Sequence, residues 1–124
     1  MTPQETVEAF IAAWNNLDME SAFGMMADDV VWHNIPLEPA NGIEAVQAMM
    51  DGFPPMEGCN WETHAIAANG NTVLTERTDN FILEGGKKAS IRVMGTFELN
   101  DEGKIQNWRD YFDGAEFQRE FLAG

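Results

Sequence analysis

The chain has 124 residues, a formal net charge of −14 and an apolar fraction of 44%. This length suits one domain with one core, and we expect a single domain over residues 1–124. The acidic balance makes nucleic acid and anionic membrane poor partners and favours a neutral or cationic ligand. No apolar run is long enough to span a membrane, no leader is visible at the N-terminus, and the single cysteine, Cys59, excludes an internal disulfide. A cytoplasmic protein is therefore expected.

The first third of the sequence predicts helices. Thr2, Pro3 and Glu5 have the pattern of a capping box with proline in the first turn. Apolar residues follow at helical spacing: Val7, Phe10, Ile11 and Trp14. Asp18 is expected to cap a second helix, whose inner residues would be Ala22, Phe23 and Met26. A short strand is predicted at 30–34, and a third helix at 43–50, capped by Asn41, with inner residues Val46, Met49 and Met50.

The remainder predicts a meander of strands. Asn69-Gly70-Asn71 separates strand patterns at 60–68 and 72–81, which is typical of a hairpin. Gly85-Gly86 and Asp101-Glu102-Gly103 then bound further strands at 88–99 and 104–112. Helices followed by consecutive strands indicate an α+β fold. We predict a curved, mixed or antiparallel sheet, shaped as a cone-like half-barrel over about three N-terminal helices, with a pocket between the sheet and the helices.

Charged side chains fall on the predicted inner face of this sheet. Alternation along a strand places Arg77 and Asp79 on the same face as Val73, Thr75 and Phe81. By the same rule Asp110 shares a face with Trp108 and Phe112, and Asn34 shares one with Val30 and Trp32. One arginine and two aspartates can be buried together only if they satisfy one another. Two coupled carboxylates then tend to divide into one acid and one base, as general acid–base catalysis requires.

Other interpretations of these residues are weaker. An arginine and an aspartate two positions apart on a strand often form only a surface salt bridge, as Arg77 and Asp79 could. His33 and His64 lie on the opposite phase, with no further ligand at metal-binding spacing. Cys59 lies in a loop with nothing nearby to lower its pKa, so a nucleophilic role is not expected. The sequence also has no glycine-rich phosphate loop between a strand and a helix.

Four stretches, "WHNIPLEPANG", "TERTD", "GTFEL" and "GKIQNWRDYFD", resemble the limonene-1,2-epoxide hydrolase family. This family lies within the cone-shaped class related to nuclear transport factor 2, also called SnoaL-like. The resemblance covers most of the chain in matching order. It implies a one-step hydrolysis in which Asp110 takes a proton from water, Asp79 protonates the epoxide oxygen, Arg77 bridges both and Asn34 helps to hold the water. It also implies a homodimer that needs no metal or other cofactor.

The resemblance further implies an apolar pocket for the substrate. Its wall would include Phe81, Ile91, Val93, Phe112 and Phe117. Trp32 stands where the family has a tyrosine that helps to hold the water, and an indole can only donate a hydrogen bond. Together with Trp108 on the inner face, Trp32 completes the predicted substrate-binding residues. The predicted reaction is the hydrolysis of an apolar, cyclic epoxide to a vicinal diol.

Two alternatives remain from the sequence. One is an enzyme resembling ketosteroid isomerases or polyketide cyclases, which would also use an inward aspartate but needs no arginine between two aspartates. Its oxyanion donor is not evident, because the only tyrosine, Tyr111, has the outward phase. The other is a binding module without catalysis, since one fold can host many functions.

Overall fold

In the computed structural model of the protein, residues 1–122 are described. The helices are α1 (Pro3–Asn15), α2 (Met19–Gly24), α3 (Ile43–Asp51) and α4 (Gly114–Phe117), followed directly by the helical turn η2 (Gln118–Leu122). The strands are β1 (Met26–Ile35), β2 (Ala40–Asn41), β3 (Met56–Asn69), β4 (Thr72–Leu83), β5 (Lys88–Leu99) and β6 (Ile105–Tyr111). A short turn, η1 (Glu84–Gly86), joins β4 to β5.

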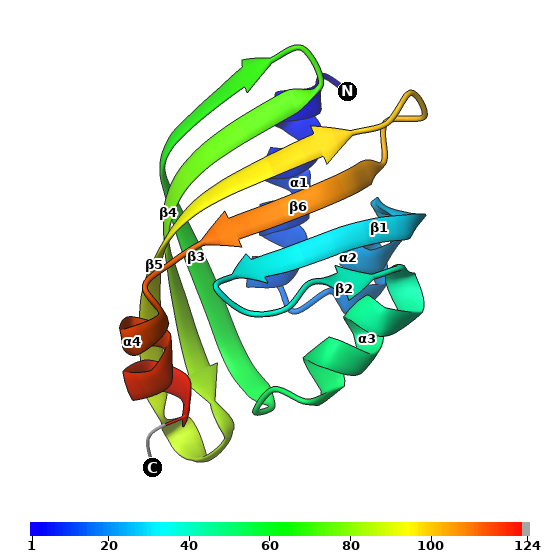
Figure 1. The fold of residues 1–124 in the computed structure, drawn as a ribbon. Coiled ribbons are helices and arrows are strands. Elements are labelled where there is room, and N and C mark those ends of the chain that lie inside the picture. The colour runs from blue at the N-terminus through cyan, green and yellow to red at the C-terminus, as the bar shows by residue number, and fades with distance from the viewer. Residues whose placement is uncertain (123–124) are drawn as a thin grey trace.

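The six strands form one curved sheet in the order β2-β1-β6-β5-β4-β3 (Figure 1). β1 and β6 run parallel, whereas every other neighbouring pair is antiparallel. Helix α1 packs across β3 and β4, and α3 packs on β1 and β2. The α+β prediction with a mixed sheet is therefore confirmed. Within residues 1–122, no helix has the length and hydrophobicity of a membrane-spanning segment.

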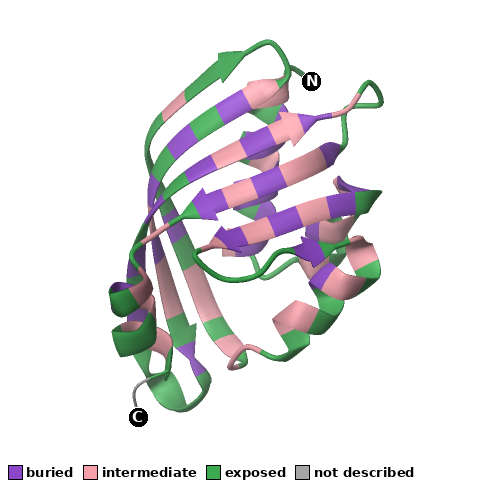
Figure 2. Ribbon diagram, in the orientation of Figure 1, coloured by how far each residue is buried: buried purple, intermediate pink, exposed green. Residues whose placement is uncertain are grey.

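Helix α1 forms as its sequence predicts. The Thr2 hydroxyl accepts a hydrogen bond from the Glu5 backbone N–H (3.1 Å), and the Glu5 carboxylate accepts one from the Thr2 backbone N–H (2.9 Å). Both halves of the capping box are thus present. The inner side chains Val7, Phe10 and Trp14 are buried against the sheet. Along the central strands β4 and β5, buried residues alternate with more exposed ones (Figure 2). Each of these strands therefore has one inner and one outer face.

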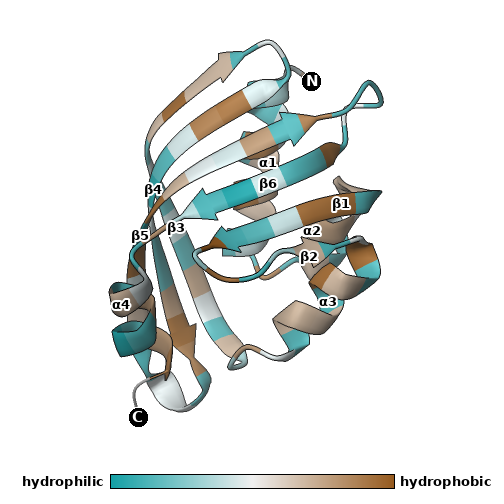
Figure 3. Ribbon diagram, viewed as in Figure 1, coloured by the Kyte–Doolittle hydropathy of each residue, from teal (hydrophilic) through white to brown (hydrophobic). Residues whose placement is uncertain are grey.

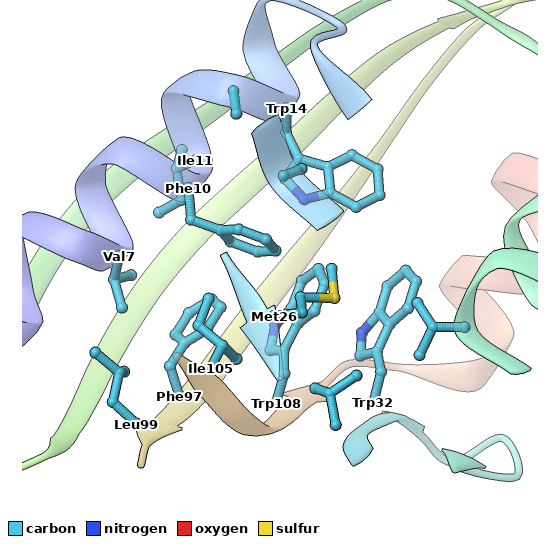
Figure 4. Close-up of a cluster of buried hydrophobic side chains, with 14 of the residues drawn as sticks. Val7, Phe10, Ile11, Trp14, Met26, Trp32, Phe97, Leu99, Ile105 and Trp108 are labelled. Carbon is cyan, nitrogen blue, oxygen red and sulfur yellow. The ribbon is translucent and has the colours of Figure 1, made fainter. Parts of the chain in front are cut away.

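The core is dominated by a row of aromatic side chains across the sheet. Trp32, Trp108 and Phe97 are direct cross-strand neighbours on β1, β6 and β5. Phe10 and Trp14 cover this row from α1 (Figure 4). The inner face of the sheet and helix α1 are therefore joined by contacts between aromatic rings.

Several predicted boundaries need correction. The second helix is capped by Asp18 as expected but ends at Gly24, and Met26 begins β1, where it pairs with Ile105 of β6. Pairing between β1 and β6 thus places Met26 in a strand, although its helical spacing predicted it to lie in the helix. Asn41 does not cap α3, because it lies in β2 and pairs with Val31 of β1. Gly42 is the N-cap of α3 and forms no side-chain hydrogen bond there.

The predicted turns agree with the structure, but β2 and the C-terminal elements α4 and η2 were missed. Gly70 and Gly103 have positive φ in the turns after β3 and β5, as a tight turn requires. The C-terminal α4 was not predicted from the sequence. It begins at Asp113, whose side chain accepts hydrogen bonds from the backbone N–H groups of Ala115 and Glu116.

Candidate functional site

A polar row lies beside the aromatic row on the inner face of the sheet. It runs through Asn34, Asp110, Gly95 and Thr75, which are successive cross-strand neighbours on β1, β6, β5 and β4. All three polar side chains are buried. The polarity of β6 is visible in the middle of the sheet (Figure 3). Strand alternation and this register therefore bring polar side chains from three strands together, with Gly95 of β5 between two of them.

Arg77 connects the two aspartates. Its Nε donates to Asp79 Oδ1 (3.0 Å), and its Nη2 donates both to Asp79 Oδ2 (2.9 Å) and to Asp110 Oδ2 (3.0 Å). Arg77 is 1% exposed, Asp79 3% and Asp110 4%. This is a buried pair of carboxylates on one guanidinium, and the alternative of a surface salt bridge is excluded.

The guanidinium is held on its other sides as well. Its Cζ lies 5.0 Å from the ring centre of Trp61 and 5.8 Å from that of Phe97, within the range of cation–π attraction. Burial alone would lower the pKa of Arg77, but the two carboxylates outweigh it and raise the pKa above its ordinary value. Arg77 is therefore a fixed cation.

The two carboxylates have different surroundings. Burial raises the pKa of Asp79 to about 6, against the opposing effect of Arg77. Asp79 receives its hydrogen bonds from Arg77, whereas Asp110 also accepts one at Oδ1 from the indole N–H of Trp108 (2.8 Å). Such a difference in surroundings suits a pair of carboxyl groups with different roles in acid–base chemistry.

Two residues that support the site were not identified from the sequence. The hydroxyl of Thr75 accepts from Arg77 Nη1 (3.0 Å) and donates to the Gly95 carbonyl oxygen (3.1 Å). A Cβ on Gly95 would lie 2.3 Å from Arg77 Nη1 and 2.5 Å from Asp110 Oδ1. A glycine inside a strand is a known sign of close approach by another group, and it could have indicated this site.

An apolar cavity of about 160 Å³ opens onto the two aspartates. Asp79, Asp110 and Asn34 are on its wall, whereas Arg77 lies behind them. The rest of the wall is apolar or aromatic: Trp14, Trp32, Met50, Phe53, Pro54, Pro55, Met56, Trp61, Phe81, Leu83, Ile91, Val93, Phe112, Phe117 and Phe121. A reacting bond held here would meet two carboxyl groups in surroundings largely free of water.

Most of the residues predicted to bind substrate lie on this wall. They are Trp32, Phe81, Ile91, Val93, Phe112 and Phe117. Trp108 needs correction: it is fully buried in the core, off the cavity wall, and contacts Asp110 instead. Its neighbours Trp32 and Phe97 cover both faces of its ring.

Four aromatic wall residues were missed from the sequence. Trp14 and Trp61 stack on each other with ring centres 4.7 Å apart, and Phe53 and Phe121 both pack near Phe117. They come from α1, β3, the loop after α3 and the C-terminal turn, so no single strand pattern contains them. Only the tertiary arrangement identifies them.

Four buried donors from residues of the cavity wall have no partner within the described protein. They are Asn34 Nδ2 and the indole nitrogens of Trp14, Trp32 and Trp61. Asn34 is the direct cross-strand neighbour of Asp110. A buried donor without a partner is costly, so an acceptor brought by solvent or substrate would stabilise this end of the cavity.

Neither histidine lies on the cavity wall, and neither does Cys59, which lies in β3 and not in the loop that the sequence predicted. His33 Nε2 donates to the Leu37 carbonyl oxygen (2.8 Å), and His64 is exposed next to Thr78. Burial raises the pKa of Cys59 to about 12, which disfavours the thiolate. In residues 1–122, His, Cys, Asp and Glu side chains form no group of three that could hold a metal ion.

Comparison with known proteins gives consistent similarity over nearly the whole chain. The family described as limonene-1,2-epoxide hydrolase catalytic domain matches residues 1–122. The epoxide hydrolase EphG of Mycobacterium tuberculosis is 35% identical over 118 residues, which cover 95% of this chain and 78% of the relative. The solved structure of an LEH-like epoxide hydrolase from M. tuberculosis has a TM-score of 0.80 at 34% identity, covering 97% of this chain and 89% of the other.

The fold extends beyond close relatives. An NTF2-like protein of unknown function from Burkholderia pseudomallei has a TM-score of 0.83 at 18% identity, covering 99% of this chain and 100% of the other. At that identity the similarity concerns the fold alone. The prediction of an NTF2-like architecture is confirmed.

Proposed function

The chain belongs to the limonene-1,2-epoxide hydrolase family and is an epoxide hydrolase, and we propose that it hydrolyses small, apolar, cyclic epoxides by one-step acid–base activation of water. The observation that carries this proposal is the pair Asp79 and Asp110 on one buried arginine, at the wall of an apolar cavity. No nucleophile from the protein is needed in this scheme.

The reaction follows from the two carboxyl environments. Asp110 takes a proton from a water molecule while the water oxygen forms a bond to an epoxide carbon. The bond from that carbon to the epoxide oxygen breaks, and Asp79 gives its proton to the oxygen. Arg77 stays charged and keeps both carboxyl groups oriented, and the free Nδ2 of Asn34 can donate to the attacking water. One proton must then pass from Asp110 to Asp79 to restore the starting state.

The size and lining of the cavity support the substrate class. An apolar cavity of ~150 Å³ is large enough for benzene, and this cavity measures about 160 Å³. A six-membered ring therefore fits, whereas a long chain would have to extend through the opening. The aromatic wall favours an apolar ring over a polar one.

Product analysis tests this proposal. Purified protein is incubated with cyclohexene oxide, styrene oxide and a cyclic terpene oxide, and the diols are quantified against blanks without enzyme. Asp79→Asn and Asp110→Asn should each lower turnover by about 10²–10⁴-fold. Asp101→Asn, in the exposed turn after β5, is the matched control and should retain turnover. Diol formation that survives both site substitutions in folded protein would refute the assigned roles.

Two other predictions from the sequence can be checked alongside. Isomerase or cyclase chemistry needs an oxyanion donor, and Tyr111, the only tyrosine, is 45% exposed on the outer face of β6. Formation of diol without isomerisation of an unsaturated ketone would distinguish the two enzyme classes, and ligand binding without turnover would indicate a binding module. The homodimer, the cytoplasmic location and the independence from cofactors stay predictions.

A further inference from the structure

We propose that Trp108 is a positioning residue that orients Asp110 and favours its ionised form, so that the two aspartates take different roles. This inference rests on the proposed function, because it assigns Asp110 as the base. Trp108 does not reach the cavity and acts only through Asp110. Neither its buried position nor its aromatic character alone would require a tryptophan here.

The indole of Trp108 cannot turn within the core. Its ring centre lies 4.3 Å from that of Trp32 with the planes 4° apart, and 5.4 Å from that of Phe97 with the planes 20° apart. These two neighbours flank it on β1 and β5, and Phe10 meets it edge-on from α1 at 5.0 Å (Figure 4). The direction of the indole N–H is therefore fixed by packing on both faces and one edge.

The indole N–H of Trp108 donates a hydrogen bond to one carboxylate oxygen of Asp110. Asp110 Oδ1 accepts from Trp108 Nε1 at 2.8 Å, and Oδ2 accepts from Arg77 Nη2 at 3.0 Å. With both oxygens held, the carboxylate plane has one orientation relative to the cavity. An indole can only donate, so it stabilises a charged carboxylate more than a protonated one.

Trp108 also offsets the unequal hydrogen bonding of the shared cation. Arg77 donates two hydrogen bonds to Asp79 and one to Asp110, so its contacts by themselves do not favour the charge on Asp110. The charged groups that face Asp110 are Arg77 and Asp79 of β4, and Asn34 of β1 is neutral. Trp108 is the uncharged donor that contacts Asp110 but not Asp79 among the described hydrogen bonds. It therefore assigns the base role to Asp110.

The first test is Trp108→Phe, which keeps an aromatic ring and removes the donor. We expect kcat/KM to fall about 10- to 100-fold, the size of a lost hydrogen bond to a charged group. The low-pH limb of the kcat/KM profile should move to higher pH, because the negative charge at Oδ1 of Asp110 then lacks its hydrogen-bond donor.

The matched control is Trp14→Phe. Trp14 belongs to the same buried cluster, but its indole nitrogen has no hydrogen-bond partner in the described protein. This change removes as much indole without touching Asp110. Because Trp14 lies on the cavity wall, substrate binding and thermal stability can change, but the low-pH limb should stay in place. Identical pH profiles for Trp108→Phe, Trp14→Phe and the wild type would overturn the proposal.

A second measurement needs neither turnover nor a folded Trp108 variant. The four indole N–H resonances of the wild-type protein are recorded by NMR, and single Phe variants at Trp14, Trp32 and Trp61 assign Trp108 by elimination. The Trp108 resonance should lie downfield of the other three and should change with pH in the wild type but not in Asp110→Asn. A Trp108 resonance grouped with the others and insensitive to Asp110 would refute the contact. Absence of diol formation would instead count against the proposed function alone.

Discussion

Replacing Gly95 by alanine should inactivate the enzyme without unfolding it. Gly95 lies between Thr75 and Asp110 in the polar row, directly beneath Arg77. A Cβ at this position would meet Arg77 Nη1 at 2.3 Å, Asp110 Oδ1 at 2.5 Å and Thr75 Oγ1 at 3.0 Å. Real Cβ atoms do not approach other atoms below 3.0 Å, so Arg77 and Asp110 must move apart.

The magnitude follows from the size of that movement. Relieving both contacts to an ordinary 3.4 Å or more shifts two charged groups by about 1 Å, and a misplacement of about 1 Å can cost ~10²-fold in rate. Overpacking in a core costs ~1–3 kcal/mol, while alanine in a strand recovers ~0.4–1 kcal/mol through the unfolded state. We therefore expect at least a ~100-fold loss of kcat with a loss of at most ~3 kcal/mol in unfolding free energy.

Gly58→Ala provides the matched control. Gly58 also lies within a strand, but its added Cβ would approach only the flexible side chain of Ile82, at 3.2 Å. The assay compares diol formation by the two variants at equal concentrations of folded protein, checked by circular dichroism and urea unfolding. Activity of Gly95→Ala within about threefold of Gly58→Ala would refute the view that this glycine makes room for the site.

Three further predictions concern neighbouring groups. Thr75→Val should lower the unfolding free energy in urea by ~1.5–3 kcal/mol, because it leaves Arg77 Nη1 buried without its acceptor; a change below ~0.5 kcal/mol would contradict this. The pKa of Asp79 is about 6 in the folded protein and 3.8 ordinarily, so its contribution to stability is complete below pH 3.8 and is lost as the pH rises through 6. The stability of the wild type relative to Asp79→Asn should accordingly fall by up to ~3 kcal/mol over that range, and a difference independent of pH would exclude the shift. Trp32→Phe should change the order of preference among epoxides if the indole only shapes the cavity, and should slow all of them if its N–H contacts water or substrate; wild-type rates on every epoxide would show that Trp32 does not act in the cavity.

Strand phase was sufficient to predict the inner face of the site. Alternation placed Arg77 and Asp79 inward on β4, and it placed Asp110 inward with Trp108 and Phe112, which lie two residues to either side of it. Inward side chains of a strand alternate with outward ones, so this pattern can be recognised from a few consecutive residues. The capping box and the hairpin turns were predictable for the same reason, because each is determined by a few consecutive residues.

Features that depend on register between strands could not be predicted in this way. The alignment of Gly95 with Thr75 and Asp110 requires the pairing of β4, β5 and β6. Trp108 has the expected inward phase, but it is off the cavity wall, and rings from four other elements pack on it: Phe10, Trp14, Trp32, Trp61 and Phe97. Met26 was assigned to a helix because its spacing suits either structure, and pairing with β6 decides between them.

The central claim is that water, and not a carboxylate of the protein, attacks the epoxide. Asp110 has the amide of Asn34 as its neighbour on β1, and within residues 1–122 no histidine lies on the cavity wall to help to hydrolyse an ester intermediate. The direct measurement is a single turnover in ¹⁸O-water with enzyme in excess over the epoxide, followed by mass spectrometry of the diol and of the protein. We predict one ¹⁸O atom in the diol from the first turnover and none in the carboxylates. An unlabelled first diol, with ¹⁸O appearing in an aspartate, would show a covalent ester route and would contradict direct attack by water.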